Sequence, residues 1–179
     1  MKTYIALLRG INVGGHKKVS MVDFRALLTK SGLENVQTYI QSGNVIFQSS
    51  EKGKGNLESR IQKLILDHFG FEVPVFVRNR KDLLTIFNNC PFSEEKKTDS
   101  YFTMLSNVPN EELVEEASKK AYPDEEYVIL KDCIYFYCAN GYGRAKFNLN
   151  FFERKLNVSA TSRNYKTMVK LLSLSQTND

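Results

Sequence analysis

Residues 4–15 of the chain read YIALLRGINVGG, and this stretch decides the fold. Its first five residues are apolar, which predicts a short buried strand, and Ser20 with Asp23 three positions later predicts the start of an amphipathic helix. Three glycines lie between them and permit positive φ and close approach of the backbone. Arg9, Asn12 and two lysines add donors beside the helix N-terminus, which attracts anions. The stretch therefore predicts a strand, a glycine-rich loop that can hold an anion, and a helix.

The first half of the chain continues with the elements of a ferredoxin-like unit. In order they are a helix over 21–28, strands over 36–40 and 45–48, a helix over 57–69 and a strand over 73–77. The last strand contains Pro74, which favours an edge position. This order, βαββαβ, defines the ferredoxin-like topology. In that topology the loop 9–15 and the polar turn 41–44 leave the sheet at one end, so we expect them to meet.

The second half repeats this order. A connecting helix over 82–89 and a charged linker over 93–100 come first, followed by a strand over 101–105, a helix over 110–121, strands over 127–130 and 133–137, a helix over 149–156, a strand over 158–161 and a terminal helix over 164–174. The ends of the halves match, since Val77-Arg78-Asn79 resembles Ser162-Arg163-Asn164. We interpret this as a tandem duplication; the alternative is that only the topology repeats. The prediction is an α+β protein of two ferredoxin-like domains, 1–92 and 93–179.

A family resemblance rests on four motifs spread along the chain: LLRGINVGG (7–15), TYIQSGNV (38–45), NCPF (89–92) and ATSRNY (160–165). In these motifs the chain resembles a bacterial family of unknown function numbered 1697. The resemblance implies a soluble bacterial protein with an α+β fold built from ferredoxin-like units, and it implies no established activity. The chain departs from the expected Thr-Arg-Asn only by Ser162, so the basic and amide groups remain.

The candidate binding residues lie in four segments. Besides the loop 9–15 and the turn 41–44, a second glycine-basic loop spans Gly141 to Lys146, and strand directions place it at one rim with Ser162-Arg163-Asn164. If the two units pack with these rims adjacent, all four segments line one cleft. The predicted ligand-binding residues are Arg9, Asn12, Gly14, Gly15, Lys17, Tyr39, Gln41, Ser42, Asn44, Arg144, Lys146, Arg163 and Asn164. The alternative is that the glycine loops are tight structural turns.

Composition narrows the choice of partners. The net charge of +5 and the pI near 9.0 favour an anionic partner, against the alternative of an evenly solvated surface. Three cysteines without a CxxC pair predict reduced structural thiols. The chain shows neither a signal h-region nor a membrane-spanning run, so we expect a cytoplasmic protein with no membrane partner.

The sequence does not identify a reaction or an oligomeric state. It contains no metal-ligand cluster, and we expect no metal and no cofactor. His68 follows a helical run and is interpreted as a packing residue, while His16 in the glycine loop has no assigned acid–base partner. Any catalysis would depend on positioning and charge stabilisation by Arg9, Arg144 or Arg163.

Three classes of function therefore compete. The first is binding of a small anionic or phosphorylated ligand at the glycine- and arginine-rich loops. The second is RNA binding, with Tyr101, Tyr135 and Tyr137 stacking bases on an open sheet face. It ranks lower because no RNP1 pattern is present and residues 4–8 are apolar on both faces, which predicts a covered sheet. The third is a platform for protein interactions.

Overall fold

A computed structural model describes residues 1–176 of the chain, which divides into two compact units. Unit 1 comprises Met1–Leu84 and the segment that begins at Lys170, and unit 2 comprises Thr85–Val169. Each unit has its own four-stranded antiparallel sheet, so the predicted α+β class with two ferredoxin-like units is confirmed. That residues 1–92 and 93–179 form separate domains stays a prediction.

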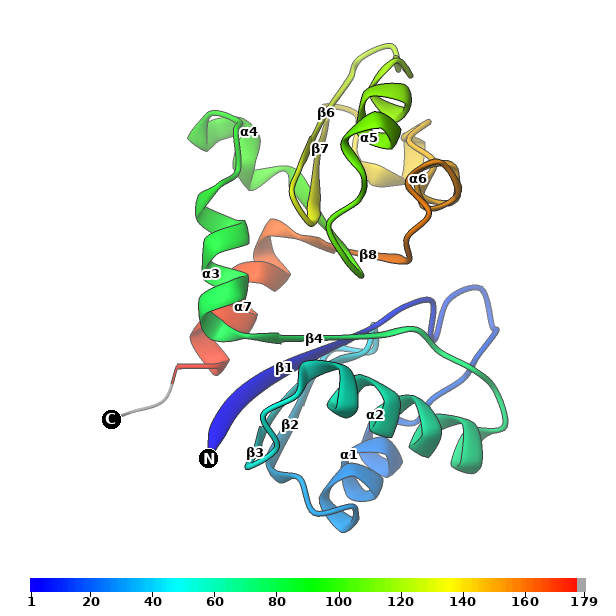
Figure 1. Cartoon of the computed structure of the whole chain (residues 1–179), viewed down its shortest axis with the longest axis vertical. Coiled ribbons are helices and arrows are strands. Elements are labelled where there is room, and N and C mark those ends of the chain that lie inside the picture. Colours follow the sequence, from blue (N-terminus) through cyan, green and yellow to red (C-terminus); the bar gives the residue numbers. More distant parts are fainter. Residues whose placement is uncertain (177–179) are drawn as a thin grey trace. The chain divides into compact units, whose positions relative to one another are not determined.

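Unit 1 has the predicted order of elements (Figure 1). They are β1 (Lys2–Leu8), α1 (Met21–Lys30), β2 (Glu34–Tyr39), β3 (Asn44–Ser49), α2 (Lys54–Phe69) and β4 (Val75–Asn79). The strand order is β2-β3-β1-β4, which makes β4 the edge strand that Pro74 predicted. Helix α3 (Arg80–Asn88) follows β4 directly.

Unit 2 repeats this order. Its elements are α4 (Glu94–Thr98), β5 (Ser100–Leu105), α5 (Glu111–Ser118), β6 (Glu125–Leu130), β7 (Cys133–Cys138), the 3-10 helix η1 (Tyr142–Arg144), α6 (Leu149–Leu156) and β8 (Ala160–Asn164), followed by α7 (Tyr165–Leu174). The strand order is β6-β7-β5-β8, the same as in unit 1. Within the charged linker predicted over 93–100, Ser93 caps the short helix α4, which was not predicted, and Ser100 begins β5.

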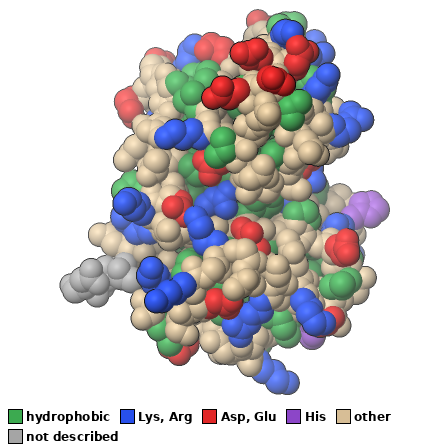
Figure 2. Space-filling view, viewed as in Figure 1, with side chains coloured by type: hydrophobic (Ala, Val, Ile, Leu, Met, Phe, Trp, Pro, Cys, Tyr) green, Lys and Arg blue, Asp and Glu red, His purple; other side chains and the backbone are tan. Residues whose placement is uncertain are grey.

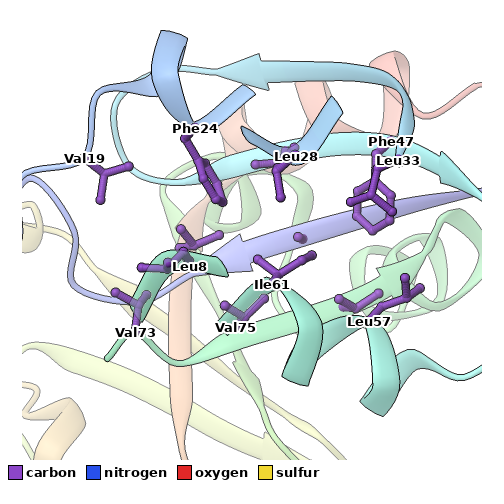
Figure 3. Close-up of a cluster of buried hydrophobic side chains, with 14 of the residues drawn as sticks. Leu8, Val19, Phe24, Leu28, Leu33, Phe47, Leu57, Ile61, Val73 and Val75 are labelled. Atoms are coloured by element: carbon purple, nitrogen blue, oxygen red, sulfur yellow. The ribbon is translucent and has the colours of Figure 1, made fainter. Parts of the chain in front are cut away.

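The core of unit 1 lies between its sheet and two helices. Phe24 and Leu28 of α1, and Leu57 and Ile61 of α2, are fully buried and point toward the strands (Figure 3). Their spacing of three or four residues places them on one helix face. On the opposite face of the sheet the alternate residues of β1 are buried as well, since Ile5 is 0% exposed. Both sheet faces are therefore covered, as the apolar run of β1 predicts.

The hydrogen bonds at the end of the central strand show that the two units share the same local structure there; that they arose by duplication stays a prediction. In unit 1 the N–H of Leu8 donates to Gly43 O at 2.8 Å, and the N–H of Arg9 donates to Pro74 O at 3.0 Å. In unit 2 the same two bonds run from Leu105 to Asp132 O and from Ser106 to Ser159 O, both at 2.8 Å. Strand register agrees, because β1 pairs with β4 as β5 pairs with β8.

The motif that suggested the duplication performs one structural task in both units. The side chain of Asn79 accepts the N–H of Asp82 at 2.8 Å, and that of Asn164 accepts the N–H of Thr167 at 2.9 Å. Each asparagine therefore caps the helix that follows its strand, which satisfies an N–H that the first turn leaves over. The preceding arginine, Arg78 or Arg163, is 6% exposed in both copies.

Replacement of Gly43 by alanine should destabilise the protein by about 2–4 kcal/mol, since a Cβ there would lie 2.6 Å from Leu8 Cβ and φ is 79°. Gly55→Ala is the matched control, because Gly55 lies in α2 with open space around it, and alanine should stabilise that helix by about 0.5 kcal/mol. Urea unfolding measures both. A Gly43→Ala variant as stable as the wild type would contradict the close approach of turn and strand.

Candidate functional site

The loop after β1 and the β2–β3 turn meet at one end of the unit 1 sheet, as strand directions predict. We call this end, formed by residues 9–18, 40–44 and 72–74, the first rim. Asn12 connects its parts, because its Nδ2 donates to Gln41 O at 2.8 Å and to Val19 O at 3.0 Å. Its Oδ1 accepts the N–H of Val19 at 2.8 Å. The amide of Asn12 therefore holds the loop against the turn.

The turn at the first rim is built in the same way. Asn44 is 0% exposed, and its Nδ2 donates to Tyr39 O and to Ser42 Oγ, both at 3.0 Å. Gln41 contributes the main-chain carbonyl that Asn12 contacts. Predicted ligand-binding residues of the turn are thus brought to one place, and the amide donor of Asn44 points inward.

Cations surround the outer part of the loop. The Lys17 ammonium reaches across to Glu72 O at 2.7 Å, which ties the loop to the segment before β4. His16, Lys17 and Lys18 are exposed, and Arg9 is half-buried. Arg9, Lys17 and Lys18 give the first rim a net positive charge, since Glu72 is the one acidic residue among those that form it.

The main-chain N–H groups of Gly14 and Gly15 are available as hydrogen-bond donors to a ligand, whereas the side-chain amides of Asn12 and Asn44 donate within the chain. Their φ angles are 58° and 78°, in the region that favours glycine. Within residues 1–176, neither of their N–H groups donates to another group of the chain. Exposed main-chain N–H groups beside cationic side chains are a recognised setting for an anion.

In unit 2, the predicted loop at Gly141 to Lys146 lies next to the first residue pair of the central strand. The ring of Tyr142 packs against that of Tyr101 with centroids 4.5 Å apart, and Tyr101 pairs with Asn164 across the sheet. The loop and the end of β8 therefore share one rim. Arg144 ends η1 and is exposed, and the N–H of Lys146 donates to Glu125 Oε1 at 2.5 Å.

Arg163 lies inside the unit rather than on the rim surface. Its Nη1 donates to Thr161 Oγ1 and to Ser162 O, both at 2.8 Å. Burial lowers the pKa of Arg163 to about 10, which still leaves the guanidinium charged at neutral pH. Asn164 uses its oxygen to cap α7. A ligand-binding role for these two residues stays a prediction.

The two glycine-basic loops are not copies of one another. The loop of the first rim connects β1 to α1, whereas Gly141–Lys146 connects β7 to α6. In the duplication, the counterpart of the first rim is the end formed by Ser106, Asp132 and Ser159. The loops therefore occupy opposite ends of their respective sheets. That the four segments line one cleft stays a prediction.

Of the aromatic residues considered for RNA stacking, Tyr135 is buried, and Tyr101 and Tyr137 are half-buried. Tyr135 is 2% exposed and donates its hydroxyl to Ile86 O at 2.8 Å. Tyr137 is half-buried, with the Phe92 ring 6.2 Å away and the Lys96 ammonium over its own ring. Stacking of a base needs an open ring face. Tyr135 does not offer one.

A cavity of about 380 Å³ beside Lys146 was missed by sequence reasoning. Its lining includes Lys120, Tyr122, Phe151 and Arg154, none of which was predicted as a site residue. The signal was present in the topology, since in a βαββαβ unit the C-terminal end of the first helix lies beside the N-terminal end of the second. This topology places the residues after α5 beside the residues before α6, and together they line the cavity.

No group of three or more His, Cys, Asp or Glu side chains in residues 1–176 is arranged to hold a metal ion. In the same residues, no helix is both long and apolar enough to cross a membrane.

Comparison with protein families gives one match, over residues 1–135, to the model described as "Protein of unknown function (DUF1697)". The match covers most of the chain. The chain belongs to the DUF1697 family. Among solved structures, this DUF1697 protein is similar to the conserved bacterial protein SP0830 from Streptococcus pneumoniae, with 26% identity, a TM-score of 0.78, and coverage of 97% of this chain and 98% of the other. No curated protein matches it.

The side chain of Asn12 should contribute more to the stability of the first rim than the side chain of Gln41, which Asn12 contacts only through the main chain. Asn12→Asp keeps the acceptor for Val19 and removes both donors, so we expect a loss of about 1–3 kcal/mol in the free energy of unfolding. Gln41→Ala is the control, because only the main-chain carbonyl of Gln41 is used, and it should change stability by less than about 0.5 kcal/mol. Equal effects in urea unfolding would contradict the bridging role.

Proposed function

We propose that the chain binds a small anionic or phosphorylated ligand at the first rim. The observation that carries this proposal is the pair of main-chain N–H groups of Gly14 and Gly15, which donate to no group within residues 1–176 and lie beside exposed cations. An anion that accepts hydrogen bonds from these N–H groups gains charge-assisted hydrogen bonds without reorganisation of the loop. Asn12 and Lys17 support the proposal by fixing the loop.

A second candidate function is a platform for protein interactions, and two exposed apolar side chains favour it. Val13 is 65% exposed and Ile40 is 51% exposed, and both belong to the first rim. Ile40 also has a φ of 50°, which is unusual for a β-branched residue. An exposed apolar residue held in a strained conformation is consistent with contact to a partner.

Pyrophosphate is the probe that tests the first proposal. At constant ionic strength, it should raise the thermal midpoint of the full chain in a saturable manner, because binding to the native state alone stabilises it. Arg9→Ala should weaken the apparent affinity about tenfold, which corresponds to the loss of one charge-assisted contact. Lys18→Met should weaken it less, because a flexible exposed lysine contributes less.

Lys52→Met is the matched control for these variants. Lys52 is an exposed lysine of unit 1 that follows β3, at the opposite end of the sheet from the first rim. It should leave the pyrophosphate response unchanged. An absent response, or a response equally reduced in the control variant, would refute the anion proposal and favour the interaction platform.

A further inference from the structure

The cavity in unit 2 has the features of a binding site, and of its lining residues only Lys146 was among the predicted ligand-binding residues. It lies between the segment that follows α5 and the first turns of α6, and we call it the α5–α6 cavity. Its volume of about 380 Å³ falls in the range of pockets that hold small ligands. Its lining consists of Lys120, Ala121, Tyr122, Pro123, Lys146, Asn148, Phe151 and Arg154.

Two aromatic rings in the lining are held in place by their neighbours. Phe151 lies edge-to-face with Phe152 at 5.1 Å, and Phe152 is fully buried. The ring of Tyr122 lies 6.0 Å from Tyr127 and 6.1 Å from Phe147. Since Tyr122 and Phe151 are each half-buried, part of each ring remains open for contact with a flat ligand.

Three cations also line the α5–α6 cavity. The Lys120 ammonium lies 5.5 Å from the centroid of Tyr122 and 6.0 Å from that of Phe151, so charge and aromatic surface are adjacent. Lys146 and Arg154 complete the set, and in the described part of the chain none of the three forms an ion pair with a carboxylate.

The carboxylate of Glu125 lies beside the cavity. Glu125 accepts the main-chain N–H of Lys146 with its Oε1. Glu125 is not part of the lining, which has three positive side chains and no negative one. Acidic side chains of unit 2 gather on α5 and at Asp124 and Glu126, which follow Pro123 of the lining, and Figure 2 shows acidic side chains in the part of the view where Figure 1 draws α5 and β6. The cavity therefore attracts an anion.

Unit 1 provides an internal comparison for this place in the fold. There, the corresponding position between the end of α1 and the start of α2 is occupied by Arg60, whose guanidinium donates to Ser31 O and lies 3.7 Å from Glu51. In unit 1 the Arg60 guanidinium is therefore paired with a main-chain carbonyl and a carboxylate of the same chain. In unit 2 the same position is open, and within residues 1–176 its cations form no ion pair with a carboxylate.

We propose that the α5–α6 cavity binds a nucleoside phosphate, with the base against Phe151 and Tyr122 and the phosphate at Lys120, Lys146 and Arg154. Aromatic side chains stack on any base, and guanidinium and ammonium groups bind phosphate. The same chemistry is offered by a free nucleotide and by the phosphorylated end of an RNA strand. The proposal is independent of the first rim and shares only Lys146 with the predicted ligand-binding residues.

Calorimetric titration of the full chain with adenosine 5′-monophosphate tests this proposal. Adenosine and inorganic phosphate should each bind at least about tenfold more weakly than the nucleotide, because each fills only half of the site. Arg154→Met and Phe151→Leu should each weaken nucleotide binding about tenfold. Backbone amide shifts of Ala121 and Phe151 on addition of the nucleotide should locate the site.

Lys155→Met is the matched control, because Lys155 is the next residue of α6, is exposed and does not line the cavity. It should bind the nucleotide as the wild type does. Absent binding, phosphate that binds as tightly as the nucleotide, or equal losses in Arg154→Met and Lys155→Met would overturn the proposal. Thermal unfolding of each variant without ligand shows that the variant is folded.

Two further experiments distinguish a free nucleotide from the phosphorylated end of an RNA strand, and the α5–α6 cavity from the first rim. A 5′-phosphorylated hexaadenylate that binds more tightly than the mononucleotide assigns the site to a strand end, and equal or weaker binding assigns it to a free nucleotide. Lys18→Met should leave nucleotide binding unchanged. If Arg9→Ala and Lys18→Met abolish nucleotide binding while Arg154→Met does not, the cavity proposal is wrong and the anion proposal at the first rim stands.

Discussion

The hydrogen bond from the last residue of each central strand to the adjacent hairpin turn is the constraint on which the rest of each unit depends. Leu8 donates to Gly43 O in unit 1, and Leu105 donates to Asp132 O in unit 2, at the same distance of 2.8 Å. In unit 1 the approach is so close that only a glycine fits opposite Leu8. The turn and the loop that leaves the strand are therefore forced to one end of the sheet, which is what creates the first rim.

The elements of the fold could be predicted because their signals are local. Apolar periodicity placed α6 at Leu149–Leu156, and Pro74 marked β4 as an edge strand. Boundaries were less accurate where capping decides them: β8 runs to Asn164 because that residue also caps α7. Helix α4 was missed because all five of its residues are polar, so it has no apolar periodicity from which a helix could be predicted.

The candidate site could be predicted only in part, because a sequence shows which donors exist but not what they already bind. Strand directions correctly joined the loop 9–15 with the turn 41–44. Asn12 and Asn44 were predicted as ligand-binding residues, and the structure shows both amides donating to main-chain carbonyls, Asn12 to that of Gln41 and Asn44 to that of Tyr39 at the end of β2. Amide side chains are well suited to this task, since they satisfy buried main-chain groups and hold the loop at positive φ. The groups of the first rim that are exposed to solvent include the main chain of Gly14 and Gly15 and the side chains of Lys17 and Lys18.

The repeated topology shows how one fold can present different chemistry at equivalent places. The copies share register, strand order, the asparagine cap and a buried arginine, all of which serve the sheet and the helix that follows it. They differ between the first and second helices, where Arg60 bonds Ser31 O in unit 1 and a cavity remains in unit 2. Because the main chain at the sheet is fixed in both copies, side chains at the helix ends can change without loss of the fold. A group of cations that has no carboxylate partner is costly for stability through mutual repulsion. That cost is offset when an anion binds, and for this reason the proposed nucleotide site lies in the cavity of unit 2 and not at the corresponding position of unit 1, where Arg60 has partners.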